Sequence, residues 1–484
     1  MSRPRLLAWC ACAAALAGAP AAQAGVDAAL RALLADARLD RTRIGVHVVD
    51  LADGTVLARH AEDRGVMPAS NLKLVSAAVA LSTLGPEFAF TTEVAAHGSI
   101  LDGVLDGDLV LRGAGDPTLG GQHEIDPRAP LAALAHRLRA EHGLREVLGA
   151  VLGDGSWLPE EGMGEGWSWD DHAADYAAPL SGLCFAENVV RIELLPTAAG
   201  RRPGMRLSPE TTYLDLEAAV VAGDPPTAID VQRDLGGNRV RLGGRIAAGS
   251  AHRVAVSVDR PSAFAAHVLR ECLRDAGILV RGPAVDLARR PGRLTGPLRP
   301  LAAHTSPPLR AVLPTLLEQS QNLYAEQLLR AAARAATGKA GMADAARHAA
   351  EVLRGLGVDP EGLVLADGSG LSRLNLVQPR QLTALLAAMW RGEHRVLWLE
   401  ALPLAGREGT LAERFPSGPA HGRVLAKTGH IRGVVALSGY VPRPDPSDAP
   451  LVFAVLLNDF ACTTDAAKAA VDAFVQELAR AAGW

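Results

Sequence analysis

A serine and a lysine three residues apart carry the first chemical signal in this sequence. The stretch PASNLKLV contains Ser70 and Lys73, and the chain has only four lysines among its 49 basic residues. Residues i and i+3 of a helix are neighbours, so the Ser70 hydroxyl and the Lys73 amine can meet. A neutral amine can accept a proton from a serine, whereas a guanidinium stays protonated in proteins. The pair is therefore a candidate nucleophile and general base.

Two further patterns follow later in the chain and contain a second of the four lysines. The stretch EQSQNLYAEQLL contains Ser320 and Asn322 just before a predicted helix, where either side chain could also act as a helix cap. The stretch LAKTGHIRGVV contains Lys427, Thr428 and Gly429 at the end of an apolar segment, which by itself is also typical of a hairpin. In the order Ser-x-x-Lys, Ser-x-Asn, Lys-Thr-Gly, the three patterns match the motif set of penicillin-binding proteins and class A β-lactamases.

The element that must position the first pair is a helix. From Leu72 the apolar positions recur at helical spacing until Gly85, so Ser70 is predicted to lie at a helix N-terminus. The free N–H groups and the positive end of the helix dipole stabilise a developing anion and disfavour a second positive charge. This setting favours a neutral Lys73.

The rest of the chain divides by pattern into three parts. Residues 25–89 read as a helix, a hairpin and the Ser70 helix, and residues 289–484 return to helices and strands that complete the same layer. Residues 90–288 carry short Val- and Leu-rich segments separated by Gly, Asp and Pro, which predicts a β-rich insertion of two subdomains. The predicted fold class is therefore α/β and multi-domain, with a discontinuous catalytic domain.

The N-terminal residues predict export. Two arginines precede an apolar run that ends in the small-residue signature Ala22-Gln23-Ala24, so residues 1–24 are predicted to be a cleaved signal peptide. The apolar run is shorter than the roughly 20 residues that span a bilayer, which disfavours a membrane anchor.

Composition excludes several function classes. The chain has 484 residues, 49% of them hydrophobic, and a formal net charge of −4, without the clustered basic surface that nucleic-acid binding requires. The absence of HExxH and CxxC motifs leaves a metal site without support. We expect no cofactor and no nucleic-acid partner.

The motif set and its spacing resemble the low-molecular-mass class C penicillin-binding proteins, which are D-alanyl-D-alanine carboxypeptidases and endopeptidases of the bacterial periplasm. The long interval between Ser70 and Ser320 is typical of that family, whose domain carries a large insertion after the first motif. The segments GAGDPTL, GDGSW, GWSWDDHAADYAAP and DGSGLSR also look familial. The resemblance implies a β-lactamase/transpeptidase-like domain with an antiparallel sheet flanked by helices.

The resemblance also implies roles for the motif residues. Ser70 would form an acyl-enzyme with Lys73 as proton acceptor, and Ser320 would relay a proton to the leaving amine. Asn322 would orient the substrate amide and Lys73. The implied substrate contacts are the carboxylate receptors Lys427 and Thr428, the ligand-facing Gly429, and the backbone N–H of His430 in an oxyanion hole with that of Ser70.

Asp171 would bind the amino end of the diaminopimelate side chain, and the adjacent Asp170 is the alternative. The implied partners are peptidoglycan stem peptides and β-lactam antibiotics as covalent inhibitors, and the implied location is the periplasm. The resemblance leaves open weak membrane association, a homodimer, and the balance of carboxypeptidase and endopeptidase activity.

Three other functions compete with this interpretation. A β-lactamase shares the acylation residues but needs a fast deacylation device, such as a glutamate that positions water. A Ser-Lys esterase would have no use for Lys427 as a carboxylate receptor. A non-catalytic wall-binding scaffold would not require the intact set of motif residues.

Overall fold

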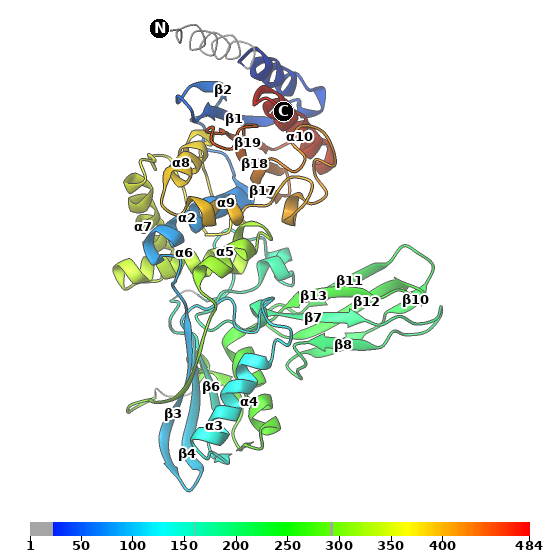
Figure 1. Cartoon of the computed structure of the whole chain (residues 1–484). Helices are drawn as coiled ribbons and strands as arrows, with labels where there is room; N and C mark the ends of the chain where they lie inside the picture. Colours follow the sequence, from blue (N-terminus) through cyan, green and yellow to red (C-terminus); the bar gives the residue numbers. More distant parts are fainter. Residues whose placement is uncertain (1–22, 160, 291–293) are drawn as a thin grey trace, which may run out of the picture. The chain divides into compact units, whose positions relative to one another are not determined.

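The computed structural model describes residues 23–159, 161–290 and 294–484. The predicted signal peptide covers residues 1–24, so all but its last two residues lie outside the described part. A helix over residues 23–34 is the first described element. The chain divides into two units, which Figure 1 colours by sequence. No helix in the described part is both long and apolar enough to cross a membrane.

The first unit comprises residues up to Thr83, Leu313–Gln321 and Ala346–Trp484. Among its described residues it contains a five-stranded antiparallel sheet in the order β17-β18-β19-β1-β2 (Figure 1). The strands are β1 (Arg43–Asp50), β2 (Val56–His60), β17 (Leu425–Ile431), β18 (Val434–Val441) and β19 (Leu451–Asn458).

Helices cover both faces of this sheet because side chains alternate along each strand. Val46 and Val48 pack into a core shared with α10 (Thr464–Ala481). Gly45 faces the other side, where an added Cβ would lie 2.8 Å from Cγ of Pro379 in α8 (Pro379–Arg391). The central strands β18 and β19 are buried at every position, as expected for strands covered on both faces.

The remaining helical elements lie wholly or partly in the first unit. They are η1 (Ala37–Leu39), η2 (Ala69–Leu72), α2 (Lys73–Leu84), α5 (Leu309–Leu317), α7 (Met342–Gly355), α9 (Arg395–Glu400) and η7 (Gly409–Leu411). The predicted Ser70 helix is therefore present as η2 followed directly by α2. Ser70 itself lies in the 3-10 turn, and the α-helix begins at Lys73.

The second unit comprises Leu84–Val312 and Asn322–Ala345. Its largest sheet, among the described residues, has seven strands, and α3 and α4 pack against it. These elements are β3 (Thr91–Leu101), β4 (Val104–Arg112), β5 (Glu146–Val147), β6 (Val151–Asp154), β14 (Leu279–Val280), β15 (Ala284–Asp286), β16 (Arg299–Thr305), α3 (Ala129–Glu141) and α4 (Pro261–Asp275).

Two smaller sheets and several short helices complete the second unit. The sheet strands are β7 (Val189–Leu194), β8 (Met205–Ser208) and β13 (His252–Ser257) in one sheet, and β9 (Asp215–Ala218), β10 (Val221–Gly223), β11 (Ala228–Arg233) and β12 (Arg239–Ala247) in the other. The helices are η3 (Trp169–Asp171), η4 (Asp175–Ala177), η5 (Ala186–Asn188), η6 (Leu287–Arg289) and α6 (Asn322–Thr337). One continuous hydrophobic core joins the large and small sheets. The domain boundaries at residues 89 and 289 stay a prediction.

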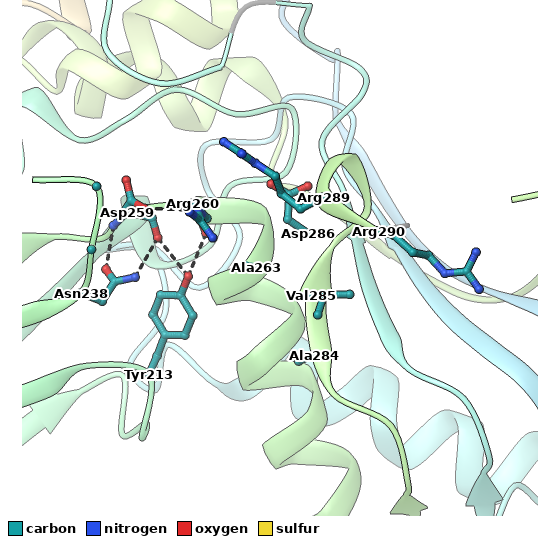
Figure 2. Close-up of a pocket in the computed structure, with 12 residues that line it drawn as sticks. Tyr213, Asn238, Asp259, Arg260, Ala263, Ala284, Val285, Asp286, Arg289 and Arg290 are labelled. Atoms are coloured by element: carbon teal, nitrogen blue, oxygen red, sulfur yellow. Dashed lines mark hydrogen bonds and ion pairs between the residues drawn. The ribbon is translucent and has the colours of Figure 1, made fainter. Parts of the chain in front are cut away.

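The second unit also contains a cavity of about 350 Å³ beside the start of α4 (Figure 2). Tyr213 donates a hydrogen bond to the carbonyl of Asp259. The side-chain amide of Asn238 donates to the same carbonyl and accepts from the backbone N–H of Asp259. The cavity is thus bordered by a rigid, internally bonded wall.

Candidate active site

The 3-10 turn η2 brings the predicted nucleophile and base together. Lys73 Nζ donates a hydrogen bond to Ser70 Oγ over 2.9 Å. Lys73 is fully buried, whereas Ser70 is partly exposed and accessible to a substrate. Ala69, the residue before the serine, has a φ of +45°, a left-handed conformation that is unusual for a residue with a Cβ. Such strained positions are common at functional sites.

A second lysine-hydroxyl pair lies in the same unit. Lys427 Nζ donates to Ser320 Oγ over 2.8 Å and to its neighbour's carbonyl, Thr428 O, over 3.1 Å. Ser320 also has a left-handed φ, +65°. The two motifs, 107 residues apart in the chain, are therefore brought into direct contact.

The edge strand β17 is joined to η2, which places the two pairs side by side. Asn71 Nδ2 donates to Lys427 O over 2.9 Å, and both residues are buried. A Cβ added to Gly429 would lie 2.7 Å from Pro68 O and 3.0 Å from Asn71 Nδ2. Glycine at this position therefore allows the strand to approach the turn that carries Ser70.

Burial and a neighbouring charge act on the second lysine. Burial lowers the pKa of Lys427 well below its ordinary value, and the neighbouring amine of Lys73 lowers it further, because two ammonium groups at this distance would repel each other. The ammonium form of Lys427 is therefore destabilised until an anion binds next to it.

Two side chains after Lys427 reach the surface of this strand: Thr428 is half-buried and His430 is exposed. Thr428 Oγ1 donates to Thr410 Oγ1 in η7 over 2.8 Å. Partial burial and Lys468 lower the pKa of His430 against the opposite effect of Asp465, which favours the neutral form of its imidazole. The side chains at this end of β17 thus offer a hydroxyl and a neutral ring.

Two predicted site residues, Asn322 and Asp171, belong to the second unit. The two lie in one bonded cluster: Asn322 Nδ2 donates to Tyr176 O over 2.7 Å, and Tyr176 Oη donates to Asp171 Oδ1 over 2.6 Å. The alternative candidate, Asp170, accepts a bond from Ser168 Oγ. The Asp171 carboxylate is held by a tyrosine whose own pKa is raised, first by burial and then by Asp171.

Sequence reasoning missed three contacts of the site. Ser369 O accepts a bond from Lys73 Nζ over 2.7 Å, Asn71 joins η2 to β17, and Thr410 meets Thr428. The stretch DGSGLSR was a signal for the first, whereas nothing in the sequence around Thr410 pointed to the site. Among the described residues, no cluster of His, Cys, Asp or Glu is arranged to hold a metal ion.

Comparison with known proteins decides the family. The model of the D-Ala-D-Ala carboxypeptidase 3 (S13) family matches residues 26–481. The chain belongs to this S13 peptidase family. This confirms the predicted membership among the D-alanyl-D-alanine carboxypeptidases that bind penicillin.

Individual S13-type relatives cover most of the chain. A D-alanyl-D-alanine carboxypeptidase of Actinomadura sp. (strain R39) is 36% identical over 93% of this chain and 84% of its own length. The crystal structure of penicillin binding protein 4 from Haemophilus influenzae superposes with a TM-score of 0.76 and 26% identity, covering 91% of this chain and 96% of that one. A second structure of the Haemophilus protein, complexed with a β-lactam, has a TM-score of 0.71 and 24% identity over 92% and 97% of the two chains. The predicted fold class is confirmed.

Proposed function

We propose that this S13 protein is a periplasmic serine DD-peptidase that works through an acyl-enzyme on Ser70. Its substrates are D-Ala-D-Ala termini, which it cleaves as a carboxypeptidase, and D-Ala-diaminopimelate crosslinks, which it cleaves as an endopeptidase. The observation that carries the proposal is the 2.9 Å contact between Ser70 Oγ and Lys73 Nζ, next to a second buried lysine.

Acylation begins when neutral Lys73 takes the Ser70 proton as Oγ bonds to the substrate carbonyl carbon. The carbonyl oxygen becomes an oxyanion, which the backbone N–H groups of Ser70 and His430 stabilise. When the intermediate collapses, the C–N bond breaks and the leaving amine receives a proton through Ser320. Water then hydrolyses the ester and regenerates the Ser70 hydroxyl.

The other site residues hold the substrate in this proposal. Lys427 and Thr428 receive the terminal carboxylate, because the buried ammonium of Lys427 gains a counter-ion only when the substrate is bound. Asn322 orients the amide, and Asp171 receives the amino end of the diaminopimelate side chain. β-Lactams acylate Ser70 as they do a peptide, in agreement with the β-lactam complex of the Haemophilus protein.

The test is intact-protein mass after incubation with penicillin, together with product analysis of a crosslinked muropeptide. We expect a penicillin adduct on Ser70, free D-alanine and cleaved crosslinks, and Ser70→Ala should abolish all three. Release of D-alanine by Ser70→Ala would refute the nucleophile assignment. Rapid release of hydrolysed penicillin would indicate a β-lactamase, and penicillin binding without an adduct would indicate a scaffold.

A further inference from the structure

The general base has a second partner far away in the sequence. Lys73 Nζ lies 2.9 Å from Ser70 Oγ and donates a hydrogen bond to the carbonyl of Ser369 over 2.7 Å. Ser369 is buried and lies in the loop of residues 366–375, which follows α7 and belongs to the same unit. The conformation of this loop therefore affects the orientation of the Lys73 amine.

One buried carboxylate lies at the centre of the 366–375 loop. Asp367 is fully buried and accepts hydrogen bonds from Gly370 N (2.8 Å), Ser372 N (2.6 Å) and Asn375 Nδ2 (2.7 Å). Asn375 Oδ1 in turn accepts from Ala366 N over 2.8 Å. Bonds from the middle and the C-terminal end of the loop thus converge on Asp367, and a carboxylate that accepts several N–H groups is a strong organising centre.

The same loop is fitted against the helix that carries the nucleophile. Ser76 Oγ in α2 donates to Gly368 O over 2.5 Å. Gly370 has a φ of +84°, and a Cβ on it would lie 1.9 Å from the carbonyl oxygen of Ala69. Only glycine allows this approach, so the loop and the residue before Ser70 are held in one register.

We propose that Asp367 is a positioning residue for the transfer of the Ser70 proton to Lys73. By shaping the 366–375 loop it holds the Ser369 carbonyl against the amine. A neutral amine that gives one N–H to this carbonyl keeps its lone pair free for the hydroxyl proton of Ser70. The inference rests on the proposed acyl-enzyme function, and it assigns a chemical reason to the DGSGLSR stretch.

The test separates binding from acylation. Stopped-flow kinetics with a fluorescent penicillin give the Kd of the non-covalent complex and the first-order acylation rate. A misplacement of about 1 Å costs about 100-fold in rate, so Asp367→Ala should lower the acylation rate by about that factor with Kd unchanged. Asp367→Asn keeps one acceptor oxygen and should lie between the wild type and Asp367→Ala.

Two further variants keep the test decisive if Asp367→Ala does not fold. Ser76→Ala is compatible with a helix and removes only the bond to Gly368, so we expect a smaller loss in the acylation rate, again with Kd unchanged. Asp445→Asn is the matched control, because that carboxylate accepts from Ser447 N in an exposed turn of the same unit, and its acylation should equal the wild type.

Folded Asp367→Asn and Ser76→Ala variants that acylate at the wild-type rate would overturn the positioning role. A rise in Kd with an unchanged acylation rate would overturn it too, since the loop would then act on ligand binding. If the wild type itself forms no Ser70 adduct, the proposed function fails, and this inference fails with it.

Discussion

The Ser70 region of the first unit and the cavity of the second unit balance their charges in different ways. Around the cavity, two of the three lining arginines face carboxylates: Arg290 lies 2.8 Å from Asp108, and Arg260 lies 3.4 Å from Asp259. In Figure 2, Arg290 points away from Tyr213 on the opposite wall. In the first unit, Lys427 donates to a hydroxyl and a carbonyl, which are neutral oxygens.

The two kinds of cation differ in how much they gain from binding an anion. A cation that already faces a carboxylate gains little from a second anion, because binding must first break the existing pair. A buried cation held only by neutral oxygens gains its full electrostatic stabilisation when a substrate carboxylate arrives. The proposed site for an anionic peptide end therefore fits beside Lys427 better than in the cavity of the second unit.

The largest effect should come from a substitution at residue 73 that keeps the positive charge but removes the general base. Lys73→Arg should lower the acylation rate by about 1,000-fold, since guanidinium cannot accept the Ser70 proton. Penicillin labelling over time measures the effect. Near-normal acylation at neutral pH would show that Lys73 acts only through its charge.

The next largest effect should come from the carboxylate receptor. Lys427→Ala should lower kcat/KM for a D-Ala-D-Ala peptide by about 100-fold, because the terminal carboxylate loses its counter-ion. A peptide that ends in a carboxamide serves as the matched substrate and should lose much less. Equal losses with both peptides would contradict the receptor role.

The lowered pKa of Lys427 predicts a pH dependence of the free enzyme. The folded-state pKa lies well below 10.5, so the ammonium form is lost as pH rises through that lower value. We therefore expect kcat/KM for the carboxylate peptide to fall by about tenfold per pH unit above it.

The control for this pH dependence is Lys427→Arg, whose guanidinium stays charged. In that variant the alkaline fall in kcat/KM should disappear, even if the activity at pH 7 is lower. An identical alkaline limb in both proteins would assign the titration to another group.

The smallest effect should come from the cavity in the second unit. Arg290→Gln removes the pair with the buried Asp108 and should reduce the free energy of unfolding by about 1 kcal/mol. Thermal unfolding measures that loss, and kcat/KM should stay within about twofold of the wild type, because the cavity residues have no part in the proposed reaction. A large loss of activity with unchanged stability would show that the cavity takes part in the reaction.

Local patterns predicted the parts of the site that depend on neighbours in the chain. The i, i+3 spacing of Ser70 and Lys73 brought their side chains to 2.9 Å, as expected for a helical turn. The predicted helix N-terminus at Ser70 is confirmed, and the structure adds that the first turn is a 3-10 turn, with the α-helix beginning at Lys73. Propensity does not distinguish these two kinds of turn at a helix end.

Contacts between distant segments could be predicted only through the family resemblance, or not at all. The motif set predicted that Ser320 and Lys427 belong to one site, but their hydrogen bond and the bond between Thr428 and Thr410 emerged only from the structure. The role predicted for Asp171 came from the resemblance, and its hydrogen bond with Tyr176 emerged only from the structure. The roles of these residues stay predictions.

The sequence by itself determined which groups are available and how they are spaced: a serine with a lysine one turn away, a second lysine on a strand, and alternating strands around them. The protonation equilibria of these groups depend on the tertiary structure. The buried position of Lys427 beside the charge of Lys73, and the Ser369 carbonyl against that amine, depend on segments that are hundreds of residues apart. Burial and the effect of nearby charges depend on every segment that packs around a residue, and a local sequence pattern does not contain that information.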